Sequence, residues 1–286
     1  MNESSDKATG TLFVVATPIG NLKDITLRAI EVLQACDWVA CEDTRHSQRL
    51  FQAHGIDSKT LALHQHNENQ QAQSIIDRLL QGHNVALVSD AGTPLISDPG
   101  FPLIQLAHEQ QLSVVPIPGP SALIALLSVA GLNTNPFTFH GFLPAKSQQR
   151  IKALEAWLPL SGTHVFYESA HRIVACVDDL LAVFGATTPV AMGRELTKTF
   201  EQVFRGSLNE LTDLIVADRN HQKGEFVLAI QGQKADTDEQ LTPEQRQLAS
   251  QLQQHLPPKT AAKVVADHYG INKKQVYQFM LDAKAP

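Results

Sequence analysis

The feature that most constrains the fold is a regular alternation of short apolar runs with longer amphipathic segments between Thr11 and Ile117. The short runs are rich in β-branched residues, which favour strands, and the longer segments repeat apolar residues at helical spacing. Strands that alternate with helices in this way form parallel sheets through right-handed βαβ crossovers. The sequence therefore predicts that the first part of the chain is an α/β domain.

The predicted elements of this first domain are five strands and the helices between them. The strands are Thr11 to Ala16, Cys36 to Cys41, Leu61 to Leu63, Val85 to Ser89, and Val114 to Ile117. The helices are Leu27 to Leu33, Gln48 to His54, Ile75 to Gln81, and Pro102 to Glu109.

The alternation is less regular after Pro118-Gly119-Pro120, which predicts a mixed α+β domain there. Predicted strands are Thr138 to Phe142, Val165 to Tyr167, Val190 to Met192, Gln202 to Phe204, and Phe226 to Ile230. Predicted helices are Ala122 to Leu132, Gln148 to Leu158, and Arg172 to Phe184. We expect a domain boundary near Pro118.

A polar segment, Asp236 to Gln240, lacks apolar periodicity and is predicted to be a linker. Three short helices are expected after it, beginning near Thr242, Pro258 and Asn272. The predicted organisation is thus an α/β domain over residues 11–118, an α+β domain over 119–239 and a small helical domain over 240–286.

Charge limits what the chain can bind. The 286 residues are 43% hydrophobic and 18% charged, which is typical of a globular protein, and the formal net charge is −6. A broadly basic nucleic-acid binder is therefore excluded, and any nucleic-acid contact has to be local. Residues 241–286 are the exception, because they hold six basic and three acidic residues, a net charge of +3.

The cysteines and the N-terminal residues indicate the cellular compartment. Only Cys36, Cys41 and Cys176 occur, without a CxxC pair, which argues against a disulfide framework. The first ten residues are polar, and the longest apolar stretch, Ala122 to Leu132, is shorter than the roughly 18 residues of a membrane span. We expect a cytoplasmic protein without a membrane segment.

Three loops follow predicted strands and are rich in Gly, Pro and small polar residues: Ala16 to Asn21, Ser89 to Pro94, and Pro118 to Ala122. Open α/β sheets bind ligands at the carboxyl ends of their strands, where the loops diverge from a rigid sheet. The alternative is that these are ordinary turns, with Asp90 and Ser121 acting as helix caps. Three such loops at one edge favour a ligand site.

Several common sites are disfavoured by missing motifs. The chain has no G-x-G-x-x-G and no G-x-x-x-x-G-K-[ST], the loops that cradle phosphates in dinucleotide and nucleotide sites. Ser121 lacks the second glycine of a G-x-S-x-G elbow. His64 and His66 have no convincing third ligand nearby in sequence, so no metal is expected.

Six ordered motifs together resemble the tetrapyrrole-methylase superfamily. They are Ala16 to Leu22, Cys41 to Arg45, Ser89 to Pro94, Pro118 to Ala122, Phe166 to Arg172, and Gly193 to Lys198, with Glu225 to Leu228 similar as well. Within the superfamily, they are most similar to the 16S ribosomal RNA cytidine 2′-O-methyltransferases. The resemblance covers about Thr11 to Gly232 and is more specific than any single loop.

The resemblance implies two α/β domains with a cofactor cleft between them, an S-adenosyl-L-methionine cofactor, and 2′-O-methylation of a cytidine in 16S ribosomal RNA. It further implies a homodimer that acts on the assembled small ribosomal subunit. By analogy, the cofactor would contact Pro18, Asp90, Ala91, Gly92, Ser121, Ala122, Phe166, Tyr167, Met192, Gly193 and Ala229. The rings of Phe166 and Tyr167 either contact the cofactor or pack in the core.

A general base would help to remove the hydroxyl proton, although positioning of the reacting atoms is the main requirement. The candidates are Glu42, Asp43, Glu168 and Glu195, each with a basic residue near it in sequence. Arg45, Arg172, Arg194 and Lys198 are candidate contacts to RNA phosphates. The alternative for all of these residues is a structural network of ion pairs.

The segment from Lys259 to Met280 resembles a helix-turn-helix, with Asn272 capping the second helix and Lys273 and Lys274 at its exposed start. It either contacts RNA or packs against protein. Two other functions remain open: methylation of a small tetrapyrrole, and a non-catalytic role in RNA binding or ribosome assembly.

Overall fold

The computed structural model describes residues 9–232 and 241–282. Its first sheet has the strand order β3-β2-β4-β1-β5, and all of its strand pairs are parallel. The strands are β1 (Thr11–Val15), β2 (Trp38–Cys41), β3 (Lys59–Ala62), β4 (Val85–Val88) and β5 (Ser113–Ile117). The parallel sheet predicted from the alternating pattern is confirmed.

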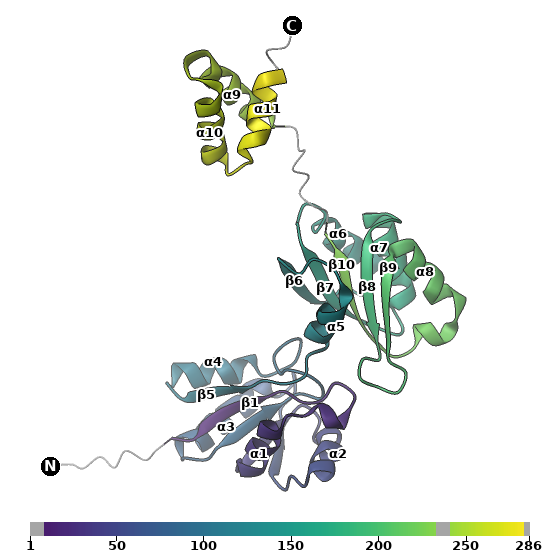
Figure 1. Ribbon diagram of the computed structural model, residues 1–286. Coiled ribbons are helices and arrows are strands. Elements are labelled where there is room, and N and C mark those ends of the chain that lie inside the picture. The colour runs from purple at the N-terminus through teal and green to yellow at the C-terminus, as the bar shows by residue number, and fades with distance from the viewer. Residues whose placement is uncertain (1–8, 233–240, 283–286) are drawn as a thin grey trace, which may run out of the picture. The chain divides into compact units, whose positions relative to one another are not determined.

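Helices cover both faces of this sheet (Figure 1). They are α1 (Leu27–Ala35), α2 (Thr44–His54), α3 (Glu68–Leu80) and α4 (Phe101–Glu109), with a short 3-10 helix at Leu22–Asp24. Buried side chains of α1 and α2 pack on one face, and those of α3 and α4 on the other. Each core therefore forms from the apolar stripe of an amphipathic helix.

The strands β1 and β4 are neighbours in the sheet. The connection after β1 crosses β4 to reach β2, and the connection after β4 crosses β1 to reach β5, so the two connections run toward opposite edges of the sheet. Such a switch point leaves a crevice at the carboxyl ends of the two strands. The loops Ala16 to Asn21 and Ser89 to Pro94 start at these ends. The topology thus brings together two of the loops that the sequence singled out.

The second sheet is mixed, with the strand order β6-β7-β10-β8-β9. Among its described strands, only β6 and β7 pair in parallel, and the other pairs are antiparallel. The strands are β6 (Phe137–Phe142), β7 (Thr163–Ser169), β8 (Pro189–Arg194), β9 (Gln202–Ser207) and β10 (Glu225–Gln231). The predicted α+β character of this half is confirmed.

Helix α5 (Ala122–Ala130) packs on one face of the second sheet, where Leu126 and Leu127 join Val165, Ala191 and Val227 in a buried cluster. The other helices of this half are α6 (Ser147–Glu155), α7 (Ile173–Phe184) and α8 (Leu208–Ala217), followed by a 3-10 helix at Arg219–Gln222. The sequence pattern did not predict α8. Its signal was the capping box at its start, in which Ser207 and Glu210 each bond to the other's backbone.

The C-terminal helices are α9 (Pro243–His255), α10 (Pro258–Tyr269) and α11 (Lys273–Asp282), as the sequence predicted. They have their own core, which includes Ala249, Val265 and Met280. Thr242 caps α9, and Gly270 ends α10 with a left-handed φ of 66°. Both capping residues mark helix ends that the sequence pattern had located.

The chain divides into two compact units. One contains both sheets, and the other contains the C-terminal helices with the short segment Ala156–Gly162. The predicted linker, Asp236 to Gln240, and the predicted boundary at residue 239 lie outside the described residues. Within the described residues, no helix combines the length and the apolar character that crossing a bilayer requires.

Candidate functional site

The three Gly- and Pro-rich loops meet at the carboxyl edge of the first sheet. Thr17 and Gly92 exchange backbone hydrogen bonds of 2.8 and 3.0 Å, and the Thr17 hydroxyl donates to the Ser89 carbonyl at 3.1 Å. The Thr93 hydroxyl donates to the Pro120 carbonyl at 3.2 Å. Gly92 has a φ of 81°, a conformation that favours glycine. The predicted convergence of the loops is confirmed.

A cavity of about 460 Å³ opens where these loops face the second sheet, within the unit that contains both sheets. Ligand pockets are commonly of this size. Its lining comes mainly from the three loops, from Glu42 after β2, from the segment after Pro94 and from strands β6, β7, β8 and β10. The site thus draws on residues more than a hundred positions apart in the sequence.

The charged residues among the described lining residues are all acidic: Glu42, Asp90, Asp98, Glu168 and Glu225. Burial raises the pKa of Glu42, and the charges of Asp90 and Asp43 add to that effect. Burial likewise raises the pKa of Asp98 to about 6, with contributions from the charges of Glu42 and Asp90. A cavity with this lining favours a cationic ligand over a phosphate-bearing one.

An aromatic wall bounds the cavity on the side of the second sheet. Tyr167 makes edge-to-face contacts with Phe139 and Phe142, with ring centroids 4.9 and 5.7 Å apart. Phe142 and Tyr167 both line the cavity, and the Phe142 side chain is exposed. This wall offers apolar ring faces and edges to a planar or cationic ligand group.

Seven of the residues expected to bind the cofactor line this cavity: Asp90, Ala91, Gly92, Ser121, Ala122, Tyr167 and Gly193. Pro18, Phe166, Met192 and Ala229 do not line it. Pro18 lies between Thr17, which bonds to Gly92, and Ile19, which does line the cavity.

The alternation of side chains along a strand explains why two of these residues lie elsewhere. Phe166 and Met192 are fully buried and directly precede Tyr167 and Gly193, so their side chains point to the opposite face of the sheet. Ala229 is buried in the cluster beneath α5. For Phe166, the structure therefore favours the core-packing alternative over contact with a ligand.

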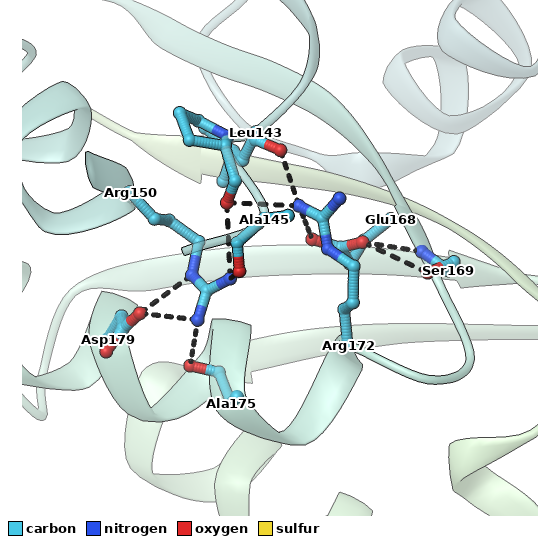
Figure 2. A network of polar contacts seen from close by, with 9 residues as sticks. Leu143, Ala145, Arg150, Glu168, Ser169, Arg172, Ala175 and Asp179 are labelled. Carbon is cyan, nitrogen blue, oxygen red and sulfur yellow. Dashed lines mark hydrogen bonds and ion pairs between the residues drawn. The ribbon is translucent and has the colours of Figure 1, made fainter. Parts of the chain in front are cut away.

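Glu168, which is among the lining residues, belongs to a buried polar network (Figure 2). Its side chain is fully buried, pairs with Arg172 at 3.1 Å, and accepts a hydrogen bond from the Ser169 backbone at 2.7 Å. Arg172 also donates to the carbonyl oxygens of Leu143 and Pro144. For both residues, the structure favours the structural ion pair over catalysis or phosphate contact.

Arg150 and Asp179 form the adjacent part of this network (Figure 2). The Arg150 side chain is 2% exposed and pairs with Asp179 at 2.6 Å. It also donates to the carbonyls of Pro144, Ala145 and Ala175 at 3.3 Å. Together, Arg150 and Arg172 hold the loop that follows Phe142.

Glu195 lies in a second ion-pair group, at the end of β8. Lys198 Nζ is 2.9 Å from both Glu195 Oε1 and Glu225 Oε2. Burial opposes ionisation of Glu195, but the hydrogen bonds from Lys198 and the Glu225 backbone outweigh it and lower its pKa. A lowered pKa weakens Glu195 as a base, and Lys198 is already neutralised.

Arg194 is largely buried, and its guanidinium donates to the carbonyls of Lys223 and Phe200 at 2.7 and 3.3 Å. These bonds tie the loop after β8 to the loop before β10. A buried guanidinium does not reach an RNA phosphate, so the structure favours a structural role for Arg194.

Asp43 caps α2 and pairs with Arg45 at 2.9 Å. Hydrogen bonds from the Arg45 side chain and backbone lower the pKa of Asp43 to about 2. Asp43 is absent from the cavity lining, whereas the neighbouring Glu42 belongs to it. The Arg45 side chain is 90% exposed and remains a candidate for phosphate contact.

The start of α11 matches its prediction. Asn272 accepts a hydrogen bond from the Lys274 backbone at 2.9 Å, and Lys273 and Lys274 are both exposed. Their role in RNA contact stays a prediction.

Asp98 and Phe142 are among the lining residues that the sequence did not predict for the site. Asp98 begins the turn sequence Asp98-Pro99-Gly100, which could have marked it as a loop carboxylate next to the Ser89 to Pro94 loop. Phe142 ends a predicted strand, but the sequence does not indicate which other segments this strand faces.

Family comparisons agree with this architecture. Residues 11–212 match the model for tetrapyrrole (corrin/porphyrin) methylases, and residues 239–284 match the RsmI C-terminal HTH domain. The chain is 46% identical over 281 residues to ribosomal RNA small subunit methyltransferase I of Escherichia coli O157:H7, covering 98% of each chain. The Pseudomonas aeruginosa protein of that name is 47% identical over 270 residues, covering 94% of this chain and 96% of its own.

Solved structures share the fold at low sequence identity. Cobalt precorrin-4 methyltransferase, a cobalamin biosynthetic enzyme, matches with a TM-score of 0.58 and 18% identity, over 77% of this chain and 94% of its own. A putative diphthine synthase from Entamoeba histolytica matches with a TM-score of 0.57 and 15% identity, over 79% of this chain and 94% of its own.

Proposed function

The chain belongs to the ribosomal RNA small subunit methyltransferase I family of the tetrapyrrole methylases, and we propose that it transfers a methyl group from S-adenosylmethionine to a ribose 2′-hydroxyl of a cytidine in 16S ribosomal RNA. The observation that carries the proposal is the cavity where the three loops converge. The residues of this cavity match the family's loop motifs.

The residues present fit the cofactor. S-adenosylmethionine carries a sulfonium and an ammonium group but no phosphate, and the charged side chains of the described lining are all carboxylates. Asp90, the backbone at Gly92 and the Tyr167 ring would hold it. When bound, the cofactor supplies an electrophilic methyl group.

Positioning is the main task of the protein in such a displacement, because the attacking oxygen, the methyl carbon and the sulfur have to be collinear. The cavity walls are suited to it. Gly92 is fixed by two backbone bonds to Thr17, and the wall at Phe142 is fixed by the arginines of the buried network. A rigid site loses little free energy to reorganisation during the reaction.

The acidic cavity also indicates how RNA would approach. Phosphates would be repelled by the carboxylates of the lining, so only the target nucleoside would enter and the phosphates would stay outside. The exposed cations Arg45, Lys273 and Lys274 are the proposed phosphate contacts. The proposed partner is 16S RNA within the assembled small subunit.

The resemblance supports a homodimer, and the three free, buried cysteines are consistent with the reducing cytoplasm. Light scattering of the purified protein would test the dimer.

Methyl transfer tests the function directly. Small subunits and free 16S RNA from cells that lack this protein would be incubated with it and radiolabelled S-adenosylmethionine, and then digested and mapped by mass spectrometry. We expect one 2′-O-methylated cytidine. Calorimetry on the same protein would measure cofactor binding. Binding without methylation of either RNA substrate would contradict the proposal and favour a small-molecule acceptor or a non-catalytic role.

A further inference from the structure

The segment that follows the Ser89 to Pro94 loop has an unusual backbone. Leu95 and Ser97 have φ values of 73° and 77°, a region that non-glycine residues seldom adopt. Gly100 has a φ of 119°, and its N–H donates to Glu68 at 2.9 Å. Such a conformation costs free energy and persists where the surrounding structure enforces it, commonly at functional sites.

This backbone carries Asp98 into the cavity, where Ile96 and Ser97 also form part of the lining. Asp98 is half-buried and lies near the Ser89 hydroxyl, which itself donates to the Ala91 carbonyl at 3.3 Å. The titratable groups whose charges act on it are Glu42, after β2, and Asp90, in the preceding loop. On the side of the second sheet, burial raises the pKa of Tyr167 in β7, and the charge of Asp98 adds to that effect.

The other carboxylates of the cavity are engaged in holding the structure. Glu42 accepts from the Asp90 backbone at 3.3 Å, and Asp90 accepts from the Asp43 backbone at 3.0 Å. Glu168 pairs with Arg172, and Glu225 pairs with Lys198. Among the carboxylates of the described lining, Asp98 is therefore the one that lines the cavity without an ion-pair partner or a backbone donor among the described residues.

We propose that Asp98 is the general base that accepts the proton of the ribose hydroxyl during methyl transfer. The inference rests on the proposed function, and it assigns the proton transfer to a residue outside the motif-based candidates. Burial and the neighbouring charges raise the pKa of Asp98 to about 6, close to the value that suits a base working near neutral pH.

Atoms and charge balance in this step. The ribose oxygen forms a bond to the methyl carbon while the carbon–sulfur bond breaks, and the electron pair of that bond remains on sulfur, which becomes neutral. The hydroxyl proton moves to a carboxylate oxygen of Asp98. It then leaves to water.

The test compares the wild type with Asp98→Asn, Asp98→Glu and a matched control, Asp57→Asn, at an exposed position outside the cavity. With subunits as substrate and saturating cofactor, Asp98→Asn is expected to lower kcat by about 10² to 10⁴-fold. Asp98→Glu is expected to restore part of the loss, and the control should match the wild type. As pH is lowered, the wild-type kcat should fall with a pKa near 6, because the base becomes protonated. The kcat of Asp98→Asn should not show this fall.

Two readouts do not depend on activity. Calorimetry of Asp98→Asn should give a cofactor affinity within about threefold of the wild type, since the other four lining carboxylates remain and a base is not needed for binding. Carbon-13 NMR of labelled aspartate carboxyls should show the Asp98 signal, identified by its loss in Asp98→Asn, titrating near pH 6. The pKa of Asp98 should fall in Glu42→Gln, because one nearby negative charge is removed.

The outcomes separate the two claims. If the wild type binds the cofactor but methylates no RNA, the proposed function fails. If the wild type is active and Asp98→Asn retains its kcat, the assignment of the base fails while the function stands. A kcat loss explained wholly by weaker cofactor binding, or an Asp98 signal that titrates near pH 4, would also overturn the assignment.

Discussion

Asp90 and Asp98 lie in the same loop region and line the same cavity, but the bonds around them differ. Asp90 is bonded on both sides, since its backbone donates to Glu42 and its carboxylate accepts from Asp43. Asp98 lies near the Ser89 hydroxyl but has no ion-pair partner and no backbone donor among the described residues. The first arrangement fixes a carboxylate in place, which suits binding, and the second leaves it ready to take a proton.

We predict that Asp90→Asn weakens binding of S-adenosylmethionine by about tenfold or more, because a bond to a charged group is worth about 1.5 to 3 kcal/mol. Asparagine keeps an acceptor oxygen for the Asp43 backbone, so the loop should keep its shape. Calorimetry measures the affinity, with Asp57→Asn as the control. Equal affinities would remove Asp90 from the cofactor site.

The raised pKa of Asp98 also predicts how stability depends on pH. The folded state binds the proton more tightly than the unfolded state, so this group's contribution to stability is most favourable at low pH and is lost as pH rises through about 6. Asp98→Asn should therefore unfold with a free energy about 1 to 2 kcal/mol higher than the wild type at pH 7.5, a figure reduced for partial solvent access. The gain should shrink at pH 5.

Urea unfolding at the two pH values measures this difference. Asp57→Asn should show no such dependence, because its carboxylate is exposed. If Asp98→Asn were less stable than the wild type at pH 7.5, the desolvation of Asp98 could not be the cause of its raised pKa.

Among the helices and strands, caps and periodicity were predictable because they depend on near neighbours in the chain. Asn272 caps α11 as predicted, and the ends of the predicted strands lie close to those observed. The contacts that join α6 to α7 were not predictable in this way. Arg150 and Asp179 are 29 positions apart in the sequence. Arg150 is also buried, although arginine is usually an exposed residue.

We predict that Arg150→Ala lowers the free energy of unfolding by about 3 kcal/mol, because it leaves Asp179, whose side chain is only 13% exposed, without its charge partner. Lys152→Ala, at an exposed position of the same helix, is the control and should change it by less than about 0.5 kcal/mol. Urea unfolding measures both. A loss below about 1 kcal/mol for Arg150→Ala would show that water or another group replaces the arginine.

Across the whole molecule, charge is divided between an acidic cavity and a C-terminal unit with exposed lysines. This division suits an RNA substrate, since the phosphates and the target nucleoside need opposite surroundings. It also explains why a net charge of −6 does not exclude RNA as a substrate.

We predict that the double variant Lys273→Gln and Lys274→Gln weakens binding to small subunits and lowers the slope of log affinity against log salt by up to about one per lysine. Fluorescence anisotropy with labelled 16S RNA fragments or subunits at several salt concentrations measures the slope. Lys146→Gln with Lys152→Gln, exposed on or next to α6, is the matched control. An unchanged slope would assign the start of α11 to protein packing instead.

Local sequence is enough to predict the class of each part of the chain and the loops of the site. Periodicity marks strands and helices because side-chain burial repeats along each element, and glycine and proline mark loops through their own backbone limits. Motifs such as Ser89 to Pro94 therefore indicate the position of the cavity through residue types and spacing alone.

Which polar residues are engaged, and which face the cavity, depends instead on how distant segments pack. Arg194, Glu168 and Arg172 are candidate functional groups by their motifs, but residues distant in the chain satisfy and bury them. Asp98 carries no such motif, and its role depends on a strained backbone and on the charges of Glu42 and Asp90, which lie in two separate loops. Burial and long-range electrostatics arise from the packing of remote segments, and the local sequence does not contain that information.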